Sequence, residues 1–192
     1  MPNLYIIAGC NGAGKTTASF TVLPELFHYR EFVNADIIAA NISPANPERV
    51  ALEAGRIMLQ RIDELLNAGA DFAFETTLST RSYVSFIKKA KGRGYKITLL
   101  YLWLTSPETA IERVAIRVKK GGHNIPNDVI IRRYYRGIDN LLNLYIPICD
   151  KWYLVENIDA NTNTIAQGVL DETKEIFNNE HWQKILKQNE RQ

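Results

Sequence analysis

Three glycines, a lysine and two threonines follow a short apolar run near the start of the chain. The run Leu4–Ala8 leads into GCNGAGKTT, in which Gly9, Gly14, Lys15 and Thr16 fit the spacing G-x-x-x-x-G-K-[ST]. Glycines allow a tight turn, and backbone N–H groups at a helix N-terminus bind anions. The lysine can reach phosphate oxygens, and the threonine hydroxyl can bind Mg²⁺. The order of strand, loop and helix argues against a chance match.

This segment is therefore predicted to be a phosphate-binding loop that holds a nucleoside triphosphate, with ATP and Mg²⁺ as the expected ligands. The residues expected to contact ATP here are Gly9, Cys10, Asn11, Gly12, Ala13, Gly14, Lys15, Thr16 and Thr17. Lys15 is also expected to act in catalysis, and Thr16 is the expected metal ligand.

Acidic and hydroxyl side chains follow two further strand-like segments. Asp36 is the first acid after the apolar pair Phe32-Val33, where it could accept a hydroxyl proton. The alternative for Asp36 is an N-cap of a short helix over 37–41. Glu75 and Thr77 follow the next strand and could bind a polar substrate, and Glu75 could instead position Mg²⁺. Capping of the following helix is the alternative for this second group.

Arginines surround a pair of glycines in the second half of the chain. Arg113 and Arg117 are four residues apart and share a helix face. Gly121-Gly122 ends that helix, Pro126 delays the next, and Arg132 and Arg133 follow. This pattern predicts a kinase lid over 118–127, with His123 as a cap or hinge and Arg117 as the preferred transition-state arginine. A solvated basic face is the alternative.

The remaining elements must position these groups. Strands are predicted over 4–8, 31–34, 71–75, 96–104 and 151–156, with helices between them from Asn46, Thr80 and Ser106. The alternation predicts an α/β fold: a P-loop NTPase three-layer sandwich with a parallel central sheet and a helical lid. Ligands of such sheets lie at the carboxyl ends of the strands. The last stretch, 165–192, is predicted to be an amphipathic helix.

Composition limits the classes of function. The 192 residues are 46% hydrophobic, which predicts one domain over 1–192, and a net charge of +2 makes a nucleic-acid or membrane partner unlikely. No apolar run reaches transmembrane length, and the start lacks a basic leader. Cys10 and Cys149 are too few for a disulfide framework or zinc site, so a cytoplasmic location is expected.

Taken together, the motifs resemble those of the zeta toxin family of P-loop kinases. The resemblance covers most of the chain and rests on IIAGCNGAGKTT, NADIIA, FETTLS, AIERVAIRV, GGHNIP, RRYYR and CDKWYLVEN. It implies transfer of phosphate from ATP to a hydroxyl of a small molecule, with UDP-N-acetylglucosamine as the best-known acceptor, and a small antitoxin protein as partner.

The resemblance also implies roles for individual residues. Lys15 and Thr16 match the phosphate and Mg²⁺ positions, and Asp36 matches the catalytic base. Glu75 and Thr77 match substrate contacts, Arg113 matches the first nucleotide-binding arginine, and the second is Arg117, Arg132 or Arg133. In nucleotide kinases the loop after the last strand flanks the adenine, which makes Asn157 a further expected ATP contact.

Two other functions fit parts of the sequence. A different small-molecule kinase or a polynucleotide 5′-hydroxyl kinase would share the fold, but basic and aromatic residues are not interleaved as single-stranded nucleic acid requires. A nucleotide-dependent switch without transfer chemistry would not need an acid at Asp36, and no guanine-reading N-K-x-D is present.

Overall fold

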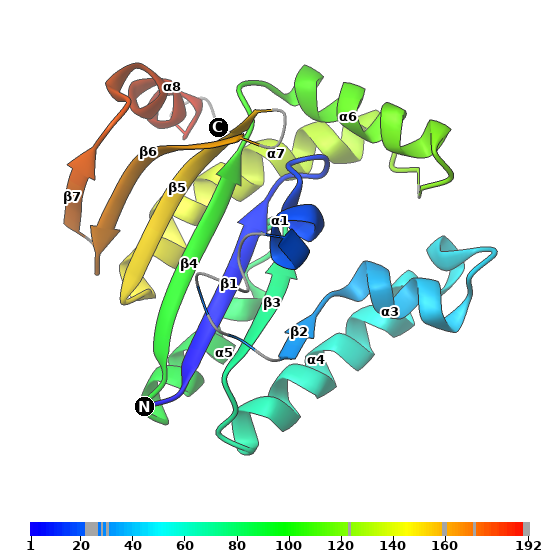
Figure 1. Ribbon diagram of the computed structural model, residues 1–192, viewed down its shortest axis with the longest axis horizontal. Helices are drawn as coiled ribbons and strands as arrows, with labels where there is room; N and C mark the ends of the chain where they lie inside the picture. Colours follow the sequence, from blue (N-terminus) through cyan, green and yellow to red (C-terminus); the bar gives the residue numbers. More distant parts are fainter. Residues whose placement is uncertain are drawn as a thin grey trace.

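The computed structural model describes residues 1–21, 27, 29, 31–122, 124–158, 161–170 and 172–189. Its centre is one seven-stranded sheet, in which β1 lies between β3 and β4 (Figure 1). The order across the sheet is β2 (Glu31–Val33), β3 (Phe72–Thr76), β1 (Asn3–Gly9), β4 (Lys96–Trp103), β5 (Lys151–Ile158), β6 (Asn161–Val169) and β7 (Glu172–Ile176).

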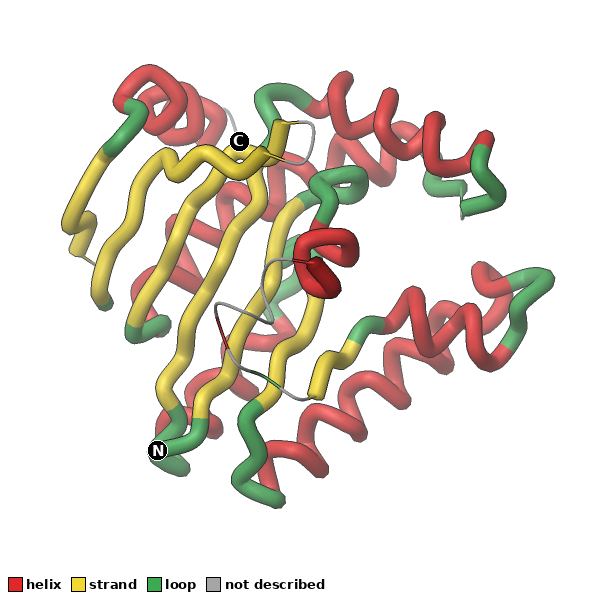
Figure 2. Tube along the Cα trace, in the orientation of Figure 1, coloured by secondary structure: helices red, strands yellow, loops and turns green. Residues whose placement is uncertain are grey.

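The first five strands are parallel and the last two are antiparallel. The parallel part confirms the predicted α/β fold with a mostly parallel central sheet. All five strands predicted from apolar runs are present, with bounds shifted by at most two residues. Figure 2 shows the strands as one continuous layer.

Helices cover the sheet on both sides. They are α1 (Lys15–Thr21), α3 (Ala35–Ile42), α4 (Ala51–Asn67), α5 (Ser82–Gly92), α6 (Pro107–Lys119), α7 (Asn127–Asn140) and α8 (Asn179–Asn189). In the view of Figure 1, α1 lies in front of the sheet, whereas α5 and α7 lie behind it. Short loops lead from the strands into these helices, and the functional side chains gather at that end of the sheet.

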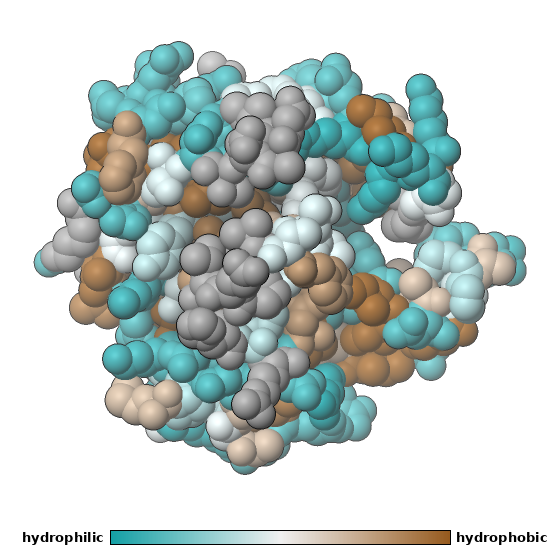
Figure 3. Space-filling model, in the orientation of Figure 1, coloured by the Kyte–Doolittle hydropathy of each residue, from teal (hydrophilic) through white to brown (hydrophobic). Residues whose placement is uncertain are grey.

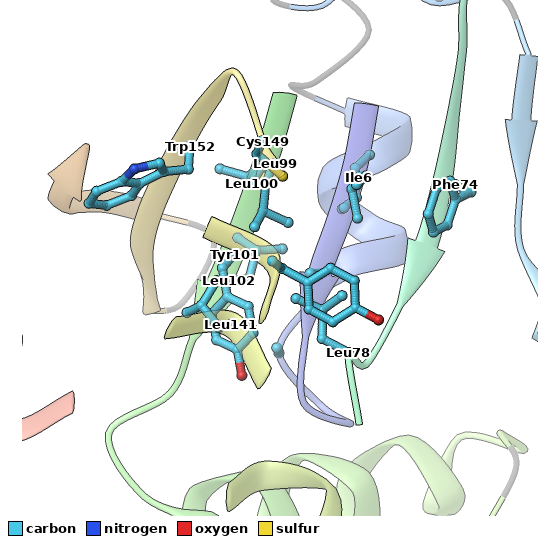
Figure 4. Close-up of a cluster of buried hydrophobic side chains, with 14 of the residues drawn as sticks. Ile6, Phe74, Leu78, Leu99, Leu100, Tyr101, Leu102, Leu141, Cys149 and Trp152 are labelled. Carbon is cyan, nitrogen blue, oxygen red and sulfur yellow. The ribbon is translucent and has the colours of Figure 1, made fainter. Parts of the chain in front are cut away.

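The hydrophobic core lies along β1, β4 and the strands beside them. Ile6, Phe74, Leu99 and Leu102 are fully buried, and Figure 4 shows them side by side with Leu78 and Leu141 from flanking segments. Strands buried on both faces have continuous rather than alternating apolar sequences, which explains why these runs were recognisable. The core holds the strand ends rigidly, so the loops above them start from fixed positions.

Local capping signals were partly correct. Ser106 caps α6 through a hydrogen bond from the Thr109 backbone N–H, and Pro107 occupies its first turn, as predicted. Asn46 makes no side-chain cap, because Pro47–Val50 forms a 3₁₀ turn and α4 begins after it. Asn34, and not Asp36, is the N-cap of α3, so the capping alternative for Asp36 is wrong.

The prediction for the C-terminal stretch was wrong. A helix was expected over 165–192, but β6 and β7 occupy most of 161–176, and only Asn179–Asn189 is helical; 190–192 lie outside the described residues. Trp182 of α8 stacks on Trp152 of β5, with ring centroids 6.1 Å apart. This hairpin and helix complete the sheet edge that the five parallel strands leave open.

Two properties bear on the expected environment. Cys10 and Cys149 are both free and buried, with no disulfide between them. None of the helices in the described ranges is long and apolar enough to span a membrane.

Candidate active site

The phosphate loop lies between the end of β1 and the start of α1. Gly14 has a φ of +82°, and a Cβ on it would lie 2.3 Å from the amide nitrogen of Asn157. That amide donates a 2.7 Å hydrogen bond to the Ala13 carbonyl. Asn157 is buried and supports the loop from below, so its amide is engaged with the protein and it does not line the cavity above the loop.

A buried network joins the loop to the end of β3. Lys15 donates a 2.9 Å hydrogen bond from Nζ to the Cys10 carbonyl and lies 3.6 Å from Oε1 of Glu75. Oε2 of Glu75 accepts hydrogen bonds from Thr16 Oγ1 at 2.8 Å and from Asn34 Nδ2 at 2.5 Å. The side chains of Lys15 and Glu75 are 7% and 9% exposed, so this ion pair is shielded from water.

The oxygen atoms of this network suit a magnesium ion. Mg²⁺ prefers hard oxygen ligands, which a threonine hydroxyl and a carboxylate supply. Thr16 and Glu75 provide both beside the phosphate loop, with the two oxygens 2.8 Å apart. The side chains present therefore fit Mg²⁺ bound together with a nucleotide. Elsewhere in the described residues, no group of three or more His, Cys, Asp or Glu side chains could hold a metal.

A cavity of about 490 Å³ opens above the loop. Of the predicted site residues, it is lined by Asn11, Gly12, Gly14, Lys15, Thr16, Thr17, Asp36, Glu75, Arg113 and Arg117. Gly9, Cys10 and Ala13 form the buried underside of the loop and do not line it. Burial raises the pKa of the Cys10 thiol to about 11, although the nearby charge of Lys15 acts in the opposite direction.

Asp36 stands in the first turn of α3, where the helix faces this cavity. Its backbone N–H donates to Oδ1 of Asn34 at 2.7 Å, and its side chain is exposed. The carboxylate is thus not occupied by capping and is accessible to an incoming hydroxyl. An exposed acid at the edge of a phosphate cavity can accept a proton from that hydroxyl.

The predicted arginines take different positions. Arg113 and Arg117 line the cavity from α6, as their spacing on one face predicted. Arg133 lies on α7 and donates to Oδ1 of Asn11 at 3.3 Å. Burial lowers the pKa of its guanidinium, while the charge of Asp36 opposes that effect. Arg132 is exposed and lines neither this cavity nor the neighbouring one.

Arg133 instead lines a second cavity of about 680 Å³, which shares Gly121 and Gly122 with the first.

Thr77 lines neither cavity, and its Oγ1 lies 2.8 Å from Oγ of Ser79. The loop that carries Thr77 is fixed from behind by the amide of Asn140, which donates a 2.6 Å hydrogen bond to the Leu78 carbonyl.

The glycine pair after α6 forms a defined helix end. Gly121 has a φ of +86°, and its N–H donates to the Val118 carbonyl, while that of Gly122 donates to Arg117. These two bonds make a Schellman motif, which satisfies the last carbonyls of the helix. The pair therefore ends α6, as predicted, and fixes how the chain leaves the helix. His123 lies outside the described residues.

Asn34 is the site residue that sequence analysis missed. It is 4% exposed and contacts both Glu75 and the backbone of Asp36. A signal was present, because Asn and Asp are equally favoured as N-caps and Asn34 stands two residues before Asp36. The pattern alone did not show which of the two capped the helix.

The strand order and the phosphate loop define the fold of a P-loop kinase. The sequence matches the zeta toxin family over residues 1–190, so the chain belongs to that family. An uncharacterized protein of Haemophilus influenzae is 32% identical over 126 residues, which make up 66% of this chain and 88% of that protein.

Solved structures share the fold. A chain from the crystal structure of AvrRxo1-ORF1:-ORF2 with ATP superposes with a TM-score of 0.76 at 20% identity over 96% of this chain. The chain spans 63% of that protein. A protein of the PezAT toxin–antitoxin system of Streptococcus pneumoniae superposes with a TM-score of 0.65 at 20% identity, and the match covers 84% of this chain and 70% of that one. Shikimate kinase from Acinetobacter baumannii superposes with a TM-score of 0.51 at 21% identity, and the match covers 83% of this chain and 86% of that one.

Proposed function

We propose that this kinase transfers the γ-phosphate of ATP to a hydroxyl group of a small molecule, with Asp36 as the general base. The observation that carries the proposal is the cavity in which Lys15, Thr16 and Asp36 meet Arg113 and Arg117. One wall supplies phosphate and metal ligands, and the other supplies positive charge. Asp36 stands in the same cavity with its carboxylate exposed.

The roles follow from the chemistry of phosphoryl transfer. Backbone N–H groups of 9–17 and Nζ of Lys15 would bind the β- and γ-phosphates, and Lys15 would leave its present contact with Glu75 to do so. Thr16 and Glu75 would hold Mg²⁺, which neutralises charge on the phosphates when bound. Asp36 would take the proton of the attacking hydroxyl. Arg113 and Arg117 would stabilise charge on the transferred group.

The acceptor is proposed from the family. UDP-N-acetylglucosamine is the first acceptor to test, and Glu75, Thr77, Arg132 and Arg133 are the proposed substrate contacts. Of these, Arg133 is supported best, because it lies close to Asp36 and lines the second cavity. A small antitoxin protein is the proposed partner, since AvrRxo1-ORF1 was solved with ORF2 and the PezAT structure belongs to a toxin–antitoxin system.

One experiment tests this function directly. Purified protein is incubated with Mg²⁺ and γ-labelled ATP in the presence of sugar nucleotides, sugars, nucleosides or oligonucleotides, and labelled products are separated. We expect label on one hydroxyl compound, formed at least about a hundredfold more slowly with Asp36→Asn. Absence of transfer to every acceptor, with no binding of ATP by calorimetry, would refute the proposal. Label on oligonucleotides alone would establish the polynucleotide kinase instead.

The segment 118–127 is proposed to act as a lid together with the ends of α6 and α7. Positive charges at Arg113, Arg117 and Lys120 line one side of the cavity, so a bound triphosphate would draw that side inward. The Schellman motif fixes the chain at Gly121, so closure should move the end of α6 as a unit. Hydrogen exchange of 118–122 and 124–127 should slow when a non-hydrolysable ATP analogue binds. Equal exchange with and without the analogue would exclude a lid.

A further inference from the structure

The side chain of Asn34 lies between the two halves of the proposed chemistry. It follows β2, is 4% exposed, and uses both ends of its amide. Nothing about the phosphate loop requires an asparagine at this point. Its contacts therefore show what the residue does for the site.

The oxygen end of the amide fixes the helix that carries Asp36. Oδ1 accepts hydrogen bonds from the backbone N–H of Asp36 at 2.7 Å and of Ile37 at 3.2 Å. These are two of the N–H groups that a helix leaves unsatisfied at its start. The position and direction of the first turn of α3 thus depend on this one oxygen, and the Asp36 carboxylate belongs to that turn.

The nitrogen end of the amide fixes the acid on the metal side. Nδ2 donates to Oε2 of Glu75 at 2.5 Å and lies 3.4 Å from Oγ1 of Thr16. The same Oε2 accepts the hydroxyl of Thr16 at 2.8 Å. Because Glu75 also pairs with Lys15 through Oε1, its two oxygens are held apart in defined directions.

We infer that Asn34 is a positioning residue that couples the helix of the general base to the metal-side acid. This inference rests on the proposed function, in which Asp36 is the base and Thr16 with Glu75 holds Mg²⁺. Phosphoryl transfer needs the attacking hydroxyl and the phosphate in line, and a misplacement of about 1 Å can cost about a hundredfold in rate. One planar amide sets the distance between the two groups, because its two ends cannot move independently.

Substitutions can separate the two ends. Serine is as good an N-cap as asparagine, but its short hydroxyl does not reach Glu75. Asn34→Ser therefore keeps the cap, loses the donor and adds no charge. Aspartate also keeps the cap, but it places a second carboxylate against Glu75. Asn34→Ala removes both the helix cap and the donor to Glu75. Asn179→Asp, at an exposed position at the start of α8, is the control for the chemical change far from the site.

The test measures the metal-side contact and the helix cap separately, without relying on turnover alone. Calorimetry with a non-hydrolysable ATP analogue, with and without Mg²⁺, gives the factor by which Mg²⁺ tightens binding. We expect this factor to be roughly tenfold smaller in Asn34→Ser, because removing a hydrogen-bond partner of a metal ligand weakens metal binding by about that much. Hydrogen exchange of the Asp36 and Ile37 N–H groups should be near wild type in Asn34→Ser and faster in Asn34→Ala.

Steady-state kinetics then report the coupling. Asn34→Ser should lower kcat roughly ten- to a hundredfold, with the KM for ATP changed much less. Wild-type kcat and wild-type Mg²⁺ tightening in Asn34→Ser would overturn the inference and leave Asn34 as a helix cap only. If Asn34→Ser does not fold, Asn34→Thr takes its place, because threonine also caps a helix and adds no charge, and the same loss of Mg²⁺ tightening is expected. A wild-type protein that transfers no phosphate would refute the proposed function, whereas the binding and exchange measurements would still decide the role of Asn34.

Discussion

The phosphate-loop side and the arginine side of the cavity are built differently. On the loop side, Glu75 lies within 3.6 Å of both Lys15 and Thr16, the Cys10 carbonyl accepts a hydrogen bond from Lys15, and a side chain from β5 supports the loop. On the arginine side, the charged groups Arg113, Arg117 and Lys120 extend from the second half of α6 and the residue that follows it. Figure 3 shows the hollow between these sides, bordered by hydrophilic surface near the end of α6.

This difference indicates two ways of stabilising charge. Groups fixed before the ligand arrives cost no reorganisation when charge develops. Groups on the proposed lid would be drawn inward by a polyphosphate, so the ligand would favour the closed state. The loop side should therefore govern whether any reaction occurs, while individual arginines should be partly replaceable. The predictions below test this division.

The largest effect is expected for Lys15→Ala. Loss of this cation from a water-shielded site should lower the turnover by about a thousandfold, the upper range for removal of one charge-stabilising donor. Lys120→Ala is the matched control, because Lys120 lines the same cavity from the end of α6. Circular dichroism should show both variants folded. Turnover that falls equally in the two variants would abolish the proposed difference between the sides.

Asp36→Asn should lower turnover by about a hundredfold or more, since an amide cannot take the hydroxyl proton. The substitution preserves size and leaves the backbone bond to Asn34 in place. Binding of the ATP analogue, measured by calorimetry, should remain near wild type. Asp128→Asn, in the first turn of α7, serves as a control and should be active. An active Asp36→Asn enzyme would restrict Asp36 to a structural role.

The arginine side should show a smaller and uneven effect. Arg117→Ala should reduce kcat by about tenfold, with less effect on ATP affinity, because Arg113 remains in the cavity and the lost charge matters most in the transition state. Arg132→Ala should keep kcat close to wild type, since Arg132 lines neither cavity, and its effect as a proposed substrate contact should fall on the KM for the acceptor. The reverse ranking of these two variants in kcat would transfer the role to Arg132.

The smallest effect concerns stability at high pH. Burial raises the pKa of Cys10 from 9.0 to about 11 and that of Cys149 to about 12, so both thiols stay protonated in the folded protein when the unfolded chain already loses its protons. Their contribution to stability is complete below pH 9 and falls as the pH rises through 11. Urea unfolding from pH 8 to 11 should show a steeper decline in the free energy of unfolding for wild type than for Cys10→Ala.

Much of the fold was predictable because the parallel strands bury both faces. Their apolar runs, such as Lys96–Trp103, have no other reasonable assignment, and the phosphate loop follows one of them directly. The antiparallel hairpin was not predictable in the same way. β6 and β7 carry many polar and exposed residues, so their sequence contains no continuous apolar run.

The site was predictable where a residue type is required by the ligand. Lys15, Thr16, Asp36 and the pair Arg113 and Arg117 lie around one cavity, as motif and spacing indicated. Thr77 and Arg132 lie outside it, because strand ends and helix faces specify a side of the molecule but not the reach of a side chain. Asn34 was missed because its role depends on Glu75, which is distant in sequence and adjacent only in the fold.

The hydrogen bond from Asn157 to the Ala13 carbonyl joins residues 144 positions apart. β1 is the middle one of the five parallel strands, and the loop at its end receives this support from β5, which comes much later in the sequence. Contacts of such long range form late, after the chain has paid the entropy of closing the loop between them. A growing chain thus contains the phosphate motif well before β5 is made, but the loop gains its support only after β5 has been synthesised. Affinity for ATP in chains stalled at increasing length should rise steeply once β5 is free to fold.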